Sequence, residues 1–354
     1  MITLFLKSLI DRIKTYTPYK DILKRFLDQT FPLYIEGPER ASLALLVSQV
    51  QKTVHETSVI VVPTEKEAEE LVHDLSLFSG NVRLFPWLQI IPYSEAAPHA
   101  SILGQRIAAL AGFIEKRAEI VVLPLKSLLY PVPKPDFIAG MCRTCTKGSD
   151  FSPVEMENYF SSIGYLRVPK VSIPGEFALR GEVLDFYPMG ETEAVRIIFE
   201  YDTIEEIKYF NPDNQFSTDS INSITIYPVQ EVVWTDERIE SLADSTQERP
   251  IDIPDLRERR TCIQEHVFFP FSFDRLYSIL DYLPERATVY FFDNQRMEAA
   301  VDTVLKEAEA SFYENRWNRN AAWHPESLFF SLDDCFEKKK RRVFFPGIRG
   351  KIGR

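Results

Sequence analysis

The sequence has few cysteines, a deficit of basic residues and no long apolar run, and each shortage excludes a class of protein. Four cysteines in 354 residues are too few and too scattered for a disulfide scaffold, which suits a reducing cytosol. Lysine and arginine number 41 against 52 acidic residues, giving a net charge of −11. That balance argues against a module built mainly to hold a nucleic-acid backbone. No stretch reaches the roughly 18 apolar residues of a membrane helix, so we expect a cytoplasmic protein without membrane contact.

Motifs for metal or nucleophilic chemistry are also missing. Cys142 and Cys145 form a C-x-x-C, but no second cysteine pair or nearby histidine completes four zinc ligands, and we interpret the spacing as chance. The histidines form no H-x-x-x-H pair, and no G-x-S-x-G elbow occurs. We therefore expect no catalytic residue, no metal and no cofactor in this chain.

An alternation of apolar runs and helical spacing fills the first third of the chain. Two helices are expected within residues 1–28, and the segments 41–54, 65–78 and 106–116 also have helical periodicity. Continuous apolar runs predict four buried strands, at residues 32–35, 58–62, 82–85 and 119–123. This order is typical of a doubly wound parallel sheet.

The character of the sequence changes after the run YPVPKPDF at residues 130–137, whose three prolines predict an exposed linker. A helix is expected at 153–162. Beyond it, β-branched and aromatic residues predict a set of antiparallel strands, at residues 175–187, 194–201, 204–210 and 224–227.

A buried strand at 288–292 and a helix at 295–313 return near the end of the chain. We therefore predict an α/β fold in which a parallel-sheet domain consists of two sequence pieces with a β-rich α+β domain inserted between them. The predicted boundaries are 1–133 for the first piece, 134–218 for the insertion and 219–354 for the second piece.

A phosphate loop would belong between the first strand and the helix at 41–54, but its functional residues are missing. A P-loop needs glycine-rich backbone amides, a lysine for the β- and γ-phosphates and a hydroxyl for magnesium. The turn reads IEGPERASLA, so that Gly37 is followed by Glu39, Arg40 and Ala41 where glycine, lysine and Ser/Thr would stand. The Glu39 carboxylate would repel phosphate, and Ala41 offers magnesium no ligand. We predict a degenerate nucleotide loop that binds no ATP. This prediction differs little from the alternative that the segment is an ordinary turn.

Two strings resemble one known family. The first is VRLFPWLQIIPYSEAAPHASILGQRIAAL at residues 82–110, and the second is IPGEFALRGEVLDFYPMG at 173–190, followed by VRIIFEYDTIEEIKYFNPDNQFS at 195–217. Together they are similar to the N-terminal, UvrB-like region of bacterial transcription-repair coupling factors (Mfd). The resemblance implies a degenerate RecA-like, P-loop-like domain in two sequence pieces and an inserted domain that binds UvrA in nucleotide excision repair.

The resemblance also implies what this chain would not do. The family's ATP-dependent motor motifs are absent, so we expect a fragment or a truncated product that is no enzyme. RNA polymerase and DNA would be bound only through domains that this chain lacks, and the chain is expected to be a monomer.

The same resemblance implies a UvrA surface on the second string. Arg180 matches the family's interaction arginine, and a guanidinium suits a bidentate contact to a carboxylate. With Arg180, the predicted partner-binding residues are Arg167, Glu176, Glu182 and Phe186. The alternative for Arg180 is a cross-strand salt bridge with Glu200 or Glu205.

Two departures from the family pattern affect this surface. Ala178 and Leu166 stand where UvrB and Mfd, respectively, have arginines, so Arg167 could have taken over one basic contact. If residues 177–185 form one strand, the side chains alternate between its two faces. On that interpretation Leu179, Gly181, Val183 and Asp185 point to one face, and Ala178, Arg180, Glu182, Leu184 and Phe186 to the other.

Two other functions stay open. An ATP-dependent UvrB-like repair helicase would need nucleotide at residues 37–41. A weak module for damaged DNA would be favoured by the basic run at residues 338–342, which we interpret as a solvated helix end or a terminal arm.

Overall fold

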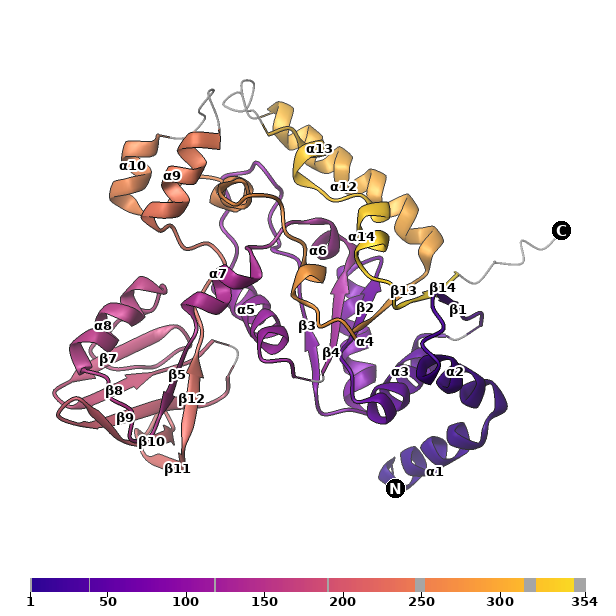
Figure 1. Cartoon of the computed structure of the whole chain (residues 1–354), viewed down its shortest axis with the longest axis horizontal. Coiled ribbons are helices and arrows are strands. Elements are labelled where there is room, and N and C mark those ends of the chain that lie inside the picture. The colour runs from indigo at the N-terminus through magenta and orange to yellow at the C-terminus, as the bar shows by residue number, and fades with distance from the viewer. Residues whose placement is uncertain are drawn as a thin grey trace.

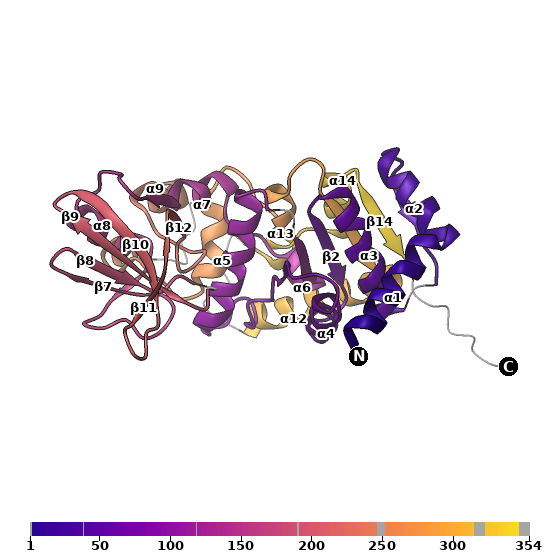
Figure 2. The same ribbon diagram turned by 90° about the horizontal axis from the view of Figure 1, so that it is seen from below.

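The computed structural model describes residues 2–37, 39–117, 119–189, 191–245, 252–314 and 323–346. Its largest parts are a six-stranded parallel sheet and a six-stranded, mostly antiparallel sheet. Figures 1 and 2 show the antiparallel sheet as a separate lobe at one end of the molecule, while the parallel sheet lies among helices in the other part. The predicted α/β class with a parallel sheet is confirmed.

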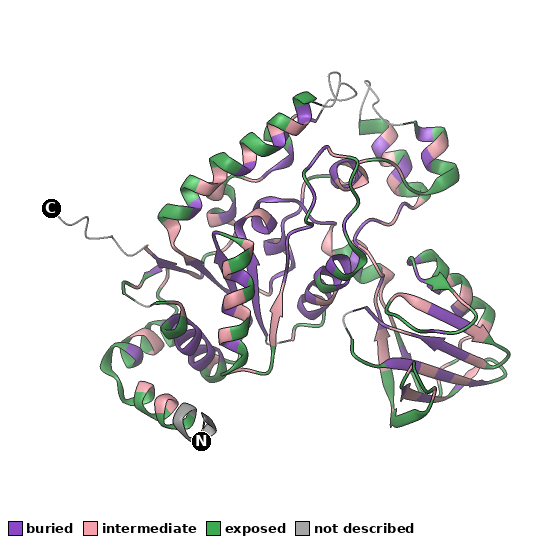
Figure 3. Ribbon diagram, turned by 180° about the vertical axis from the view of Figure 1, so that it is seen from behind, coloured by how far each residue is buried: buried purple, intermediate pink, exposed green. Residues whose placement is uncertain are grey.

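The parallel sheet has the strand order β1-β14-β13-β2-β4-β3. Its strands are β1 (Leu33–Tyr34), β2 (Ser58–Val62), β3 (Val82–Leu84), β4 (Ile120–Pro124), β13 (Thr288–Phe292) and β14 (Arg342–Phe345). Every position of β2 and β4 is buried, as Figure 3 shows in purple, because helices cover both faces of a parallel sheet. The five strands predicted for this sheet are confirmed, and β14 was not predicted.

Helices form a layer on each face of this sheet. One face is covered by α2 (Thr17–Leu27), α3 (Arg40–Val54) and α4 (Glu65–Ser76), and α1 (Ile2–Thr15) contacts α2. The other face is covered by α5 (Ala100–Ile114), α6 (Leu125–Leu129) and α12 (Asn294–Glu314). Helix α5 begins six residues earlier than predicted, because the His99 side chain accepts a hydrogen bond from the Ser101 amide and caps it.

The antiparallel lobe has the strand order β11-β10-β9-β8-β7-β6. Its strands are β6 (Leu166–Arg167), β7 (Glu176–Arg180), β8 (Val183–Phe186), β9 (Ala194–Glu200), β10 (Thr203–Phe210) and β11 (Ser217–Ile221). A two-stranded sheet of β5 (Arg143–Thr146) and β12 (Ser223–Ile226) accompanies it. Helix α8 (Pro153–Ser162) begins with a capping box of Ser152 and Glu155 and packs on the sheet through Phe160.

The strand predicted at residues 175–187 is wrong in one respect, because the segment is a hairpin. Strands β7 and β8 pair antiparallel, with Arg180 opposite Val183. Gly181 has a φ of +63°, a backbone conformation that glycine adopts readily, and this permits the tight turn between the strands.

The exposed linker predicted at residues 130–137 is also wrong. The segment from Tyr130 to Pro133 is buried, and α7 (Pro135–Met141) follows directly. Val132 donates its amide to the Tyr277 carbonyl at 2.8 Å, and the Tyr282 hydroxyl donates to the Pro133 carbonyl at 2.8 Å. Proline has no N–H to leave unpaired, so a proline-rich run can be buried at low cost.

The chain between β12 and β13 is mostly helical. It contains α9 (Asp236–Ser245), α10 (Ile253–Arg259), α11 (Glu265–Phe268) and the 3₁₀ helices η1 (Phe269–Ser272) and η2 (Ile279–Tyr282). Between α12 and β14 lie α13 (Pro325–Leu328) and α14 (Leu332–Lys338).

A buried ion pair joins α5 to the chain that leaves the antiparallel lobe. Arg106 is fully buried and Glu231 nearly so. The Arg106 guanidinium donates to both carboxylate oxygens of Glu231, and Nη1 donates to the Pro86 carbonyl at 2.8 Å. Its carbon Cζ lies 4.0 Å from the centre of the Phe85 ring. The pair therefore fixes the return of the chain against the parallel-sheet part of the molecule.

A second contact between the two parts depends on a missing side chain. The methyl end of Met189, from the loop after β8, lies so close to Gly104 of α5 that a Cβ there would overlap it. Gly104 thus leaves the room in which Met189 packs.

We predict that Arg106→Met lowers the free energy of unfolding by about 3–5 kcal/mol, because it leaves the Glu231 carboxylate buried without its cation. Urea unfolding followed by circular dichroism measures this. The matched control is Arg257→Met, which removes an ion pair with Glu240 whose side chains are about half exposed and is expected to cost less than about 1 kcal/mol. Equal effects of the two substitutions would contradict a special role for the buried pair.

Candidate protein-binding surface

The β7–β8 hairpin decides which side chains share a face. Residues directly opposite each other in an antiparallel pair lie on the same side of the sheet. Arg180 is opposite Val183, and Ala178 is opposite Asp185, which is itself opposite Arg196 on β9. Arg180 and Asp185 therefore share a face. The prediction that Asp185 points away from Arg180 is wrong, because it treated the hairpin as one strand.

Asp185 holds two guanidinium groups on this face. Arg180 Nη2 donates to Asp185 Oδ2 at 2.5 Å, and Arg196 donates to both carboxylate oxygens at 2.6 and 2.9 Å. Asp185 is fully buried, whereas the Arg180 side chain is 48% exposed. Arg196 also lies over the Phe210 ring at 4.7 Å, and its hydrogen bond to Asp185 raises its pKa. Arg180 is thus anchored at one nitrogen and open to solvent elsewhere. The salt bridge is to Asp185, not to Glu200 or Glu205.

The other charged residues predicted for the surface lie near the same edge of the sheet. Arg167, on the edge strand β6, is exposed, is opposite Phe177 and forms an ion pair with Glu157 of α8. It therefore lies on the α8 side of the edge, and Arg180 lies on the other side. The Glu176 carboxylate accepts hydrogen bonds from the amides of Ser172 and Ile173 at 2.7 and 3.1 Å, so it shapes the loop before β7. Glu182 is exposed in the hairpin turn.

Two exposed apolar side chains at this edge were not among the predicted residues. Leu166 on β6 is opposite Glu176, and Ile173 lies in the loop that Glu176 holds; both are largely exposed. The available signals were Leu166 in place of the family's arginine and the apolar Ile173 at the start of the second string. Isolated exposed apolar residues are common, so these signals were weak.

Phe186 does not lie on the surface. It is fully buried, and its ring centre lies 4.8 Å from that of Phe160 on α8. Its predicted role as a partner contact does not fit this burial, so we assign it to the core of the lobe. Ala178 is also buried, next to Val171 and Phe210.

Arg40, which follows the loop at Gly37, is held against helix α4. Gly37 has a φ of +95°, and Glu39 is the N-cap residue of α3 without a side-chain cap bond. Arg40 Nε donates to Asp74 Oδ2 at 2.7 Å, and the guanidinium also pairs with Glu70 of α4. The bond to Asp74 raises the pKa of Arg40. Ala41 is exposed in the first turn of α3. Pro38 lies outside the described residues.

The basic run at residues 338–342 is neither a solvated helix end nor a terminal arm, because it connects α14 to β14 within the fold. Lys338 pairs with Asp281 at 2.6 Å, Lys339 donates to the Leu283 carbonyl at 2.9 Å, and Arg341 pairs with Glu56 at 2.5 Å. Most of its charge is therefore engaged by the protein itself.

The remaining features offer little for chemistry. Burial raises the pKa of Cys142 to about 12 and that of Cys145 to about 11, so neither thiol ionises at neutral pH. Within the described residues, no group of three or more His, Cys, Asp or Glu side chains could hold a metal ion. In the same part of the chain, no helix has the length and apolar character to span a bilayer.

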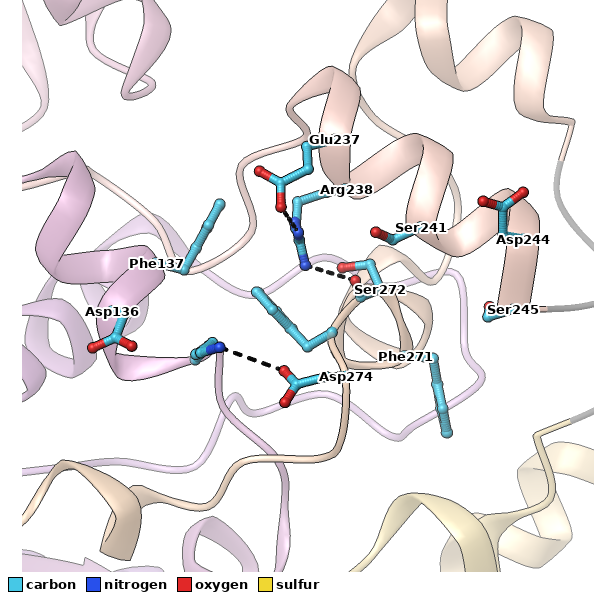
Figure 4. Close-up of a pocket in the computed structure, with 12 residues that line it drawn as sticks. Asp136, Phe137, Glu237, Arg238, Ser241, Asp244, Ser245, Phe271, Ser272 and Asp274 are labelled. Atoms are coloured by element: carbon cyan, nitrogen blue, oxygen red, sulfur yellow. Dashed lines mark hydrogen bonds and ion pairs between the residues drawn. The ribbon is translucent and has the colours of Figure 1, made fainter.

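A cleft of about 710 Å³ lies where α7, α9 and η1 meet (Figure 4). Two of its cations are engaged by the protein itself, because Arg238 donates to the Ser272 carbonyl at 2.7 Å and Lys134 lies 3.6 Å from Asp274. None of the residues predicted for a site lines this cleft, and no sequence motif marks it.

Comparison with known proteins bears on the antiparallel lobe. Residues 144–231 match the UvrB interaction domain family, which covers β5 through β12. The chain resembles a transcription-repair-coupling factor. Proteins of that name from Borreliella burgdorferi, Haemophilus influenzae and Bacillus subtilis are 28%, 27% and 23% identical to it, over 70%, 87% and 95% of this chain.

The same matches cover 22%, 27% and 30% of the three relatives. The chain thus spans less than a third of the relatives' length. The similarity suggested by the two strings is confirmed, and it extends beyond them along most of this chain.

We predict that Phe186→Ala lowers the free energy of unfolding by about 3–5 kcal/mol, because it opens a cavity against α8. Glu182→Ala, in the exposed turn of the same hairpin, is expected to change it by less than about 0.5 kcal/mol. Thermal and urea unfolding of the two variants measure the difference. A Phe186→Ala variant as stable as the parent chain would contradict the assignment of this residue to the core of the lobe.

Proposed function

We propose that this chain is a non-catalytic recruitment module that binds UvrA and so brings nucleotide excision repair to stalled RNA polymerase. The observation that carries the proposal is the match of residues 144–231 to the UvrB interaction domain, joined to the exposed, anchored guanidinium of Arg180 in that domain. The names of the relatives support the link to transcription and repair.

The proposed contact surface is the edge of the sheet formed by β6, β7 and the hairpin turn. Arg180 and Arg167 would bind carboxylates of UvrA, since guanidinium groups suit paired oxygen acceptors. Glu182 would contact a cation, and Glu176 would set the shape of the loop before β7. The exposed Leu166 supplies apolar area beside them, which a charged contact alone would lack.

The anchoring of Arg180 favours binding. A long side chain loses rotamer freedom when it is fixed at an interface, and that loss weakens association. Here the buried carboxylate of Asp185 already holds one end of the guanidinium, while Arg196 neutralises the rest of the carboxylate. Part of the ordering cost is therefore met before the partner arrives.

We further propose that the parallel-sheet domain is RecA-like and consists of two sequence pieces. Strands β13 and β14 follow the antiparallel lobe in sequence yet pair between β1 and β2, which supports this division. The pairing of β12 with β5 favours an insertion that extends past residue 218, to about the end of the family match at 231. ATP-driven translocation and contacts to RNA polymerase and DNA would belong to parts of the relatives that this chain does not match.

The proposal predicts that Arg180→Glu weakens binding of UvrA at least about tenfold, because it replaces an anchored cation by a charge that Asp185 repels. Titration of purified UvrA by calorimetry measures the affinity. The control is Arg257→Glu on α10, whose side chain is 50% exposed, against 48% for Arg180; it should bind like the parent chain. Unchanged affinity of Arg180→Glu would remove this residue from the surface.

The proposal also predicts that a fluorescent ATP analogue does not bind at millimolar concentration, because Arg40 is held by Glu70 and Asp74 and Ala41 offers magnesium no oxygen. Fluorescence anisotropy measures binding, with an intact P-loop ATPase as the positive control. Saturable binding that Glu39→Lys strengthens would support the ATP-dependent alternative instead.

A further inference from the structure

A groove of about 1060 Å³ runs along the amino-terminal edge of the parallel sheet. Its lining comes from the segments that lead into β1, β2, β13 and β14. The groove therefore lies where these strands begin, and the loop at Gly37 lies at their other end. We call this groove the amino-edge groove. Its lining residues that matter here are Leu27, Phe31, Val54, Glu56, Glu285, Arg286, Lys338, Lys339, Lys340 and Arg341.

The groove is positively charged although the whole chain is acidic. Five cations, Arg286 and the four residues 338–341, line it against only two carboxylates, Glu56 and Glu285. Lys338 is neutralised by Asp281 and Arg341 by Glu56. The side chains of Lys340 and Arg286 are exposed and, within the described residues, form no ion pair.

Part of this charge is desolvated without a carboxylate partner. The Lys339 ammonium donates to the Leu283 carbonyl, and its burial lowers its pKa. The Arg341 side chain is only 8% exposed and already pairs with Glu56, so it adds little free charge. A partly buried ammonium without a carboxylate partner is unfavourable, so an anionic group that enters the groove near Lys339 would be stabilised.

The groove also has apolar lining residues. Leu27, at the end of α2, is 61% exposed, and Val54 and Phe31 are half-buried beside it. The Arg341 guanidinium lies over the Phe31 ring at 5.0 Å, and Phe31 forms a T-shaped pair with Phe26 at 5.3 Å. One face of the ring is therefore occupied by a guanidinium, which leaves less of it for stacking a nucleic-acid base.

We propose that the amino-edge groove binds an acidic peptide segment of a partner protein, with carboxylates at Arg286, Lys339 and Lys340 and an apolar side chain against Leu27. Charge complementarity and the apolar lining together favour this occupant. Nucleic acid could use the same cations but would gain nothing from the exposed apolar side chain of Leu27. The groove belongs to the parallel-sheet domain, so this proposal does not depend on UvrA binding by the antiparallel lobe.

The test uses the full chain and a fluorescein-labelled peptide of repeated Glu-Glu-Leu-Asp units, followed by fluorescence anisotropy at low salt. We expect saturable binding that weakens at least about tenfold in the double variant Arg286→Glu/Lys340→Glu. Lys116→Glu/Lys306→Glu is the matched control, because it makes the same change of net charge at two exposed positions outside the groove. It should bind the peptide like the parent chain.

A further variant tests the apolar lining at Leu27, and a second peptide tests the contribution of the cations. Leu27→Ser should weaken binding several-fold, and a peptide with glutamine and asparagine in place of the acids should not bind. An equal loss in both double variants, or no binding of the acidic peptide, would overturn the proposal. Tighter binding of a thymidine oligonucleotide of equal length, with the same dependence on Arg286 and Lys340, would replace the peptide by single-stranded nucleic acid.

Discussion

The buried ion pair between Arg106 and Glu231 is the constraint on which the arrangement of this molecule depends. The two residues are 125 positions apart in the sequence, and the whole antiparallel lobe lies between them. A buried pair of this kind tolerates the loss of neither partner, because the remaining charge would stay in a low-dielectric interior. The pair therefore holds the chain that returns from the lobe against α5, and β13 and β14, which follow in sequence, pair between β1 and β2.

This constraint explains how the two parts of the molecule divide their roles. The parallel sheet is closed by helices on both faces, and the turn after β1 holds Arg40 against α4. It acts as a scaffold. The antiparallel lobe uses one face to pack on α8 and leaves the hairpin turn, Arg180 and the edge strand β6 in solvent. Met189, seated at Gly104, and the ion pair keep the lobe in place on that scaffold.

Much of the fold could be predicted because burial leaves a strong trace in sequence. Strands β2, β4 and β13 are continuous apolar runs, and the helix at 153–162 was predicted at its observed bounds. The buried prolines at 131 and 133 could not be predicted, since exposed linkers and buried turns share the same composition. Nothing local showed that Arg106, part of a recognisable string, pairs with Glu231.

The candidate surface was predicted less well, and the cause is a two-residue turn. Along one strand, Arg180 and Asp185 lie on opposite faces, because they are an odd number of residues apart. In a hairpin that turns at Gly181 and Glu182, the pairing joins residues of odd separation, such as Ala178 and Asp185, on one face. The same turn carries Phe186 to the helix side with Phe177, where it is buried.

Hydrogen exchange of this chain with and without UvrA would test the central claim most directly. The account predicts slower exchange in the complex across residues 166–186, which include β6, β7 and the hairpin turn, with the parallel sheet unchanged. Protection confined to the parallel-sheet domain, or none at saturating UvrA, would contradict it.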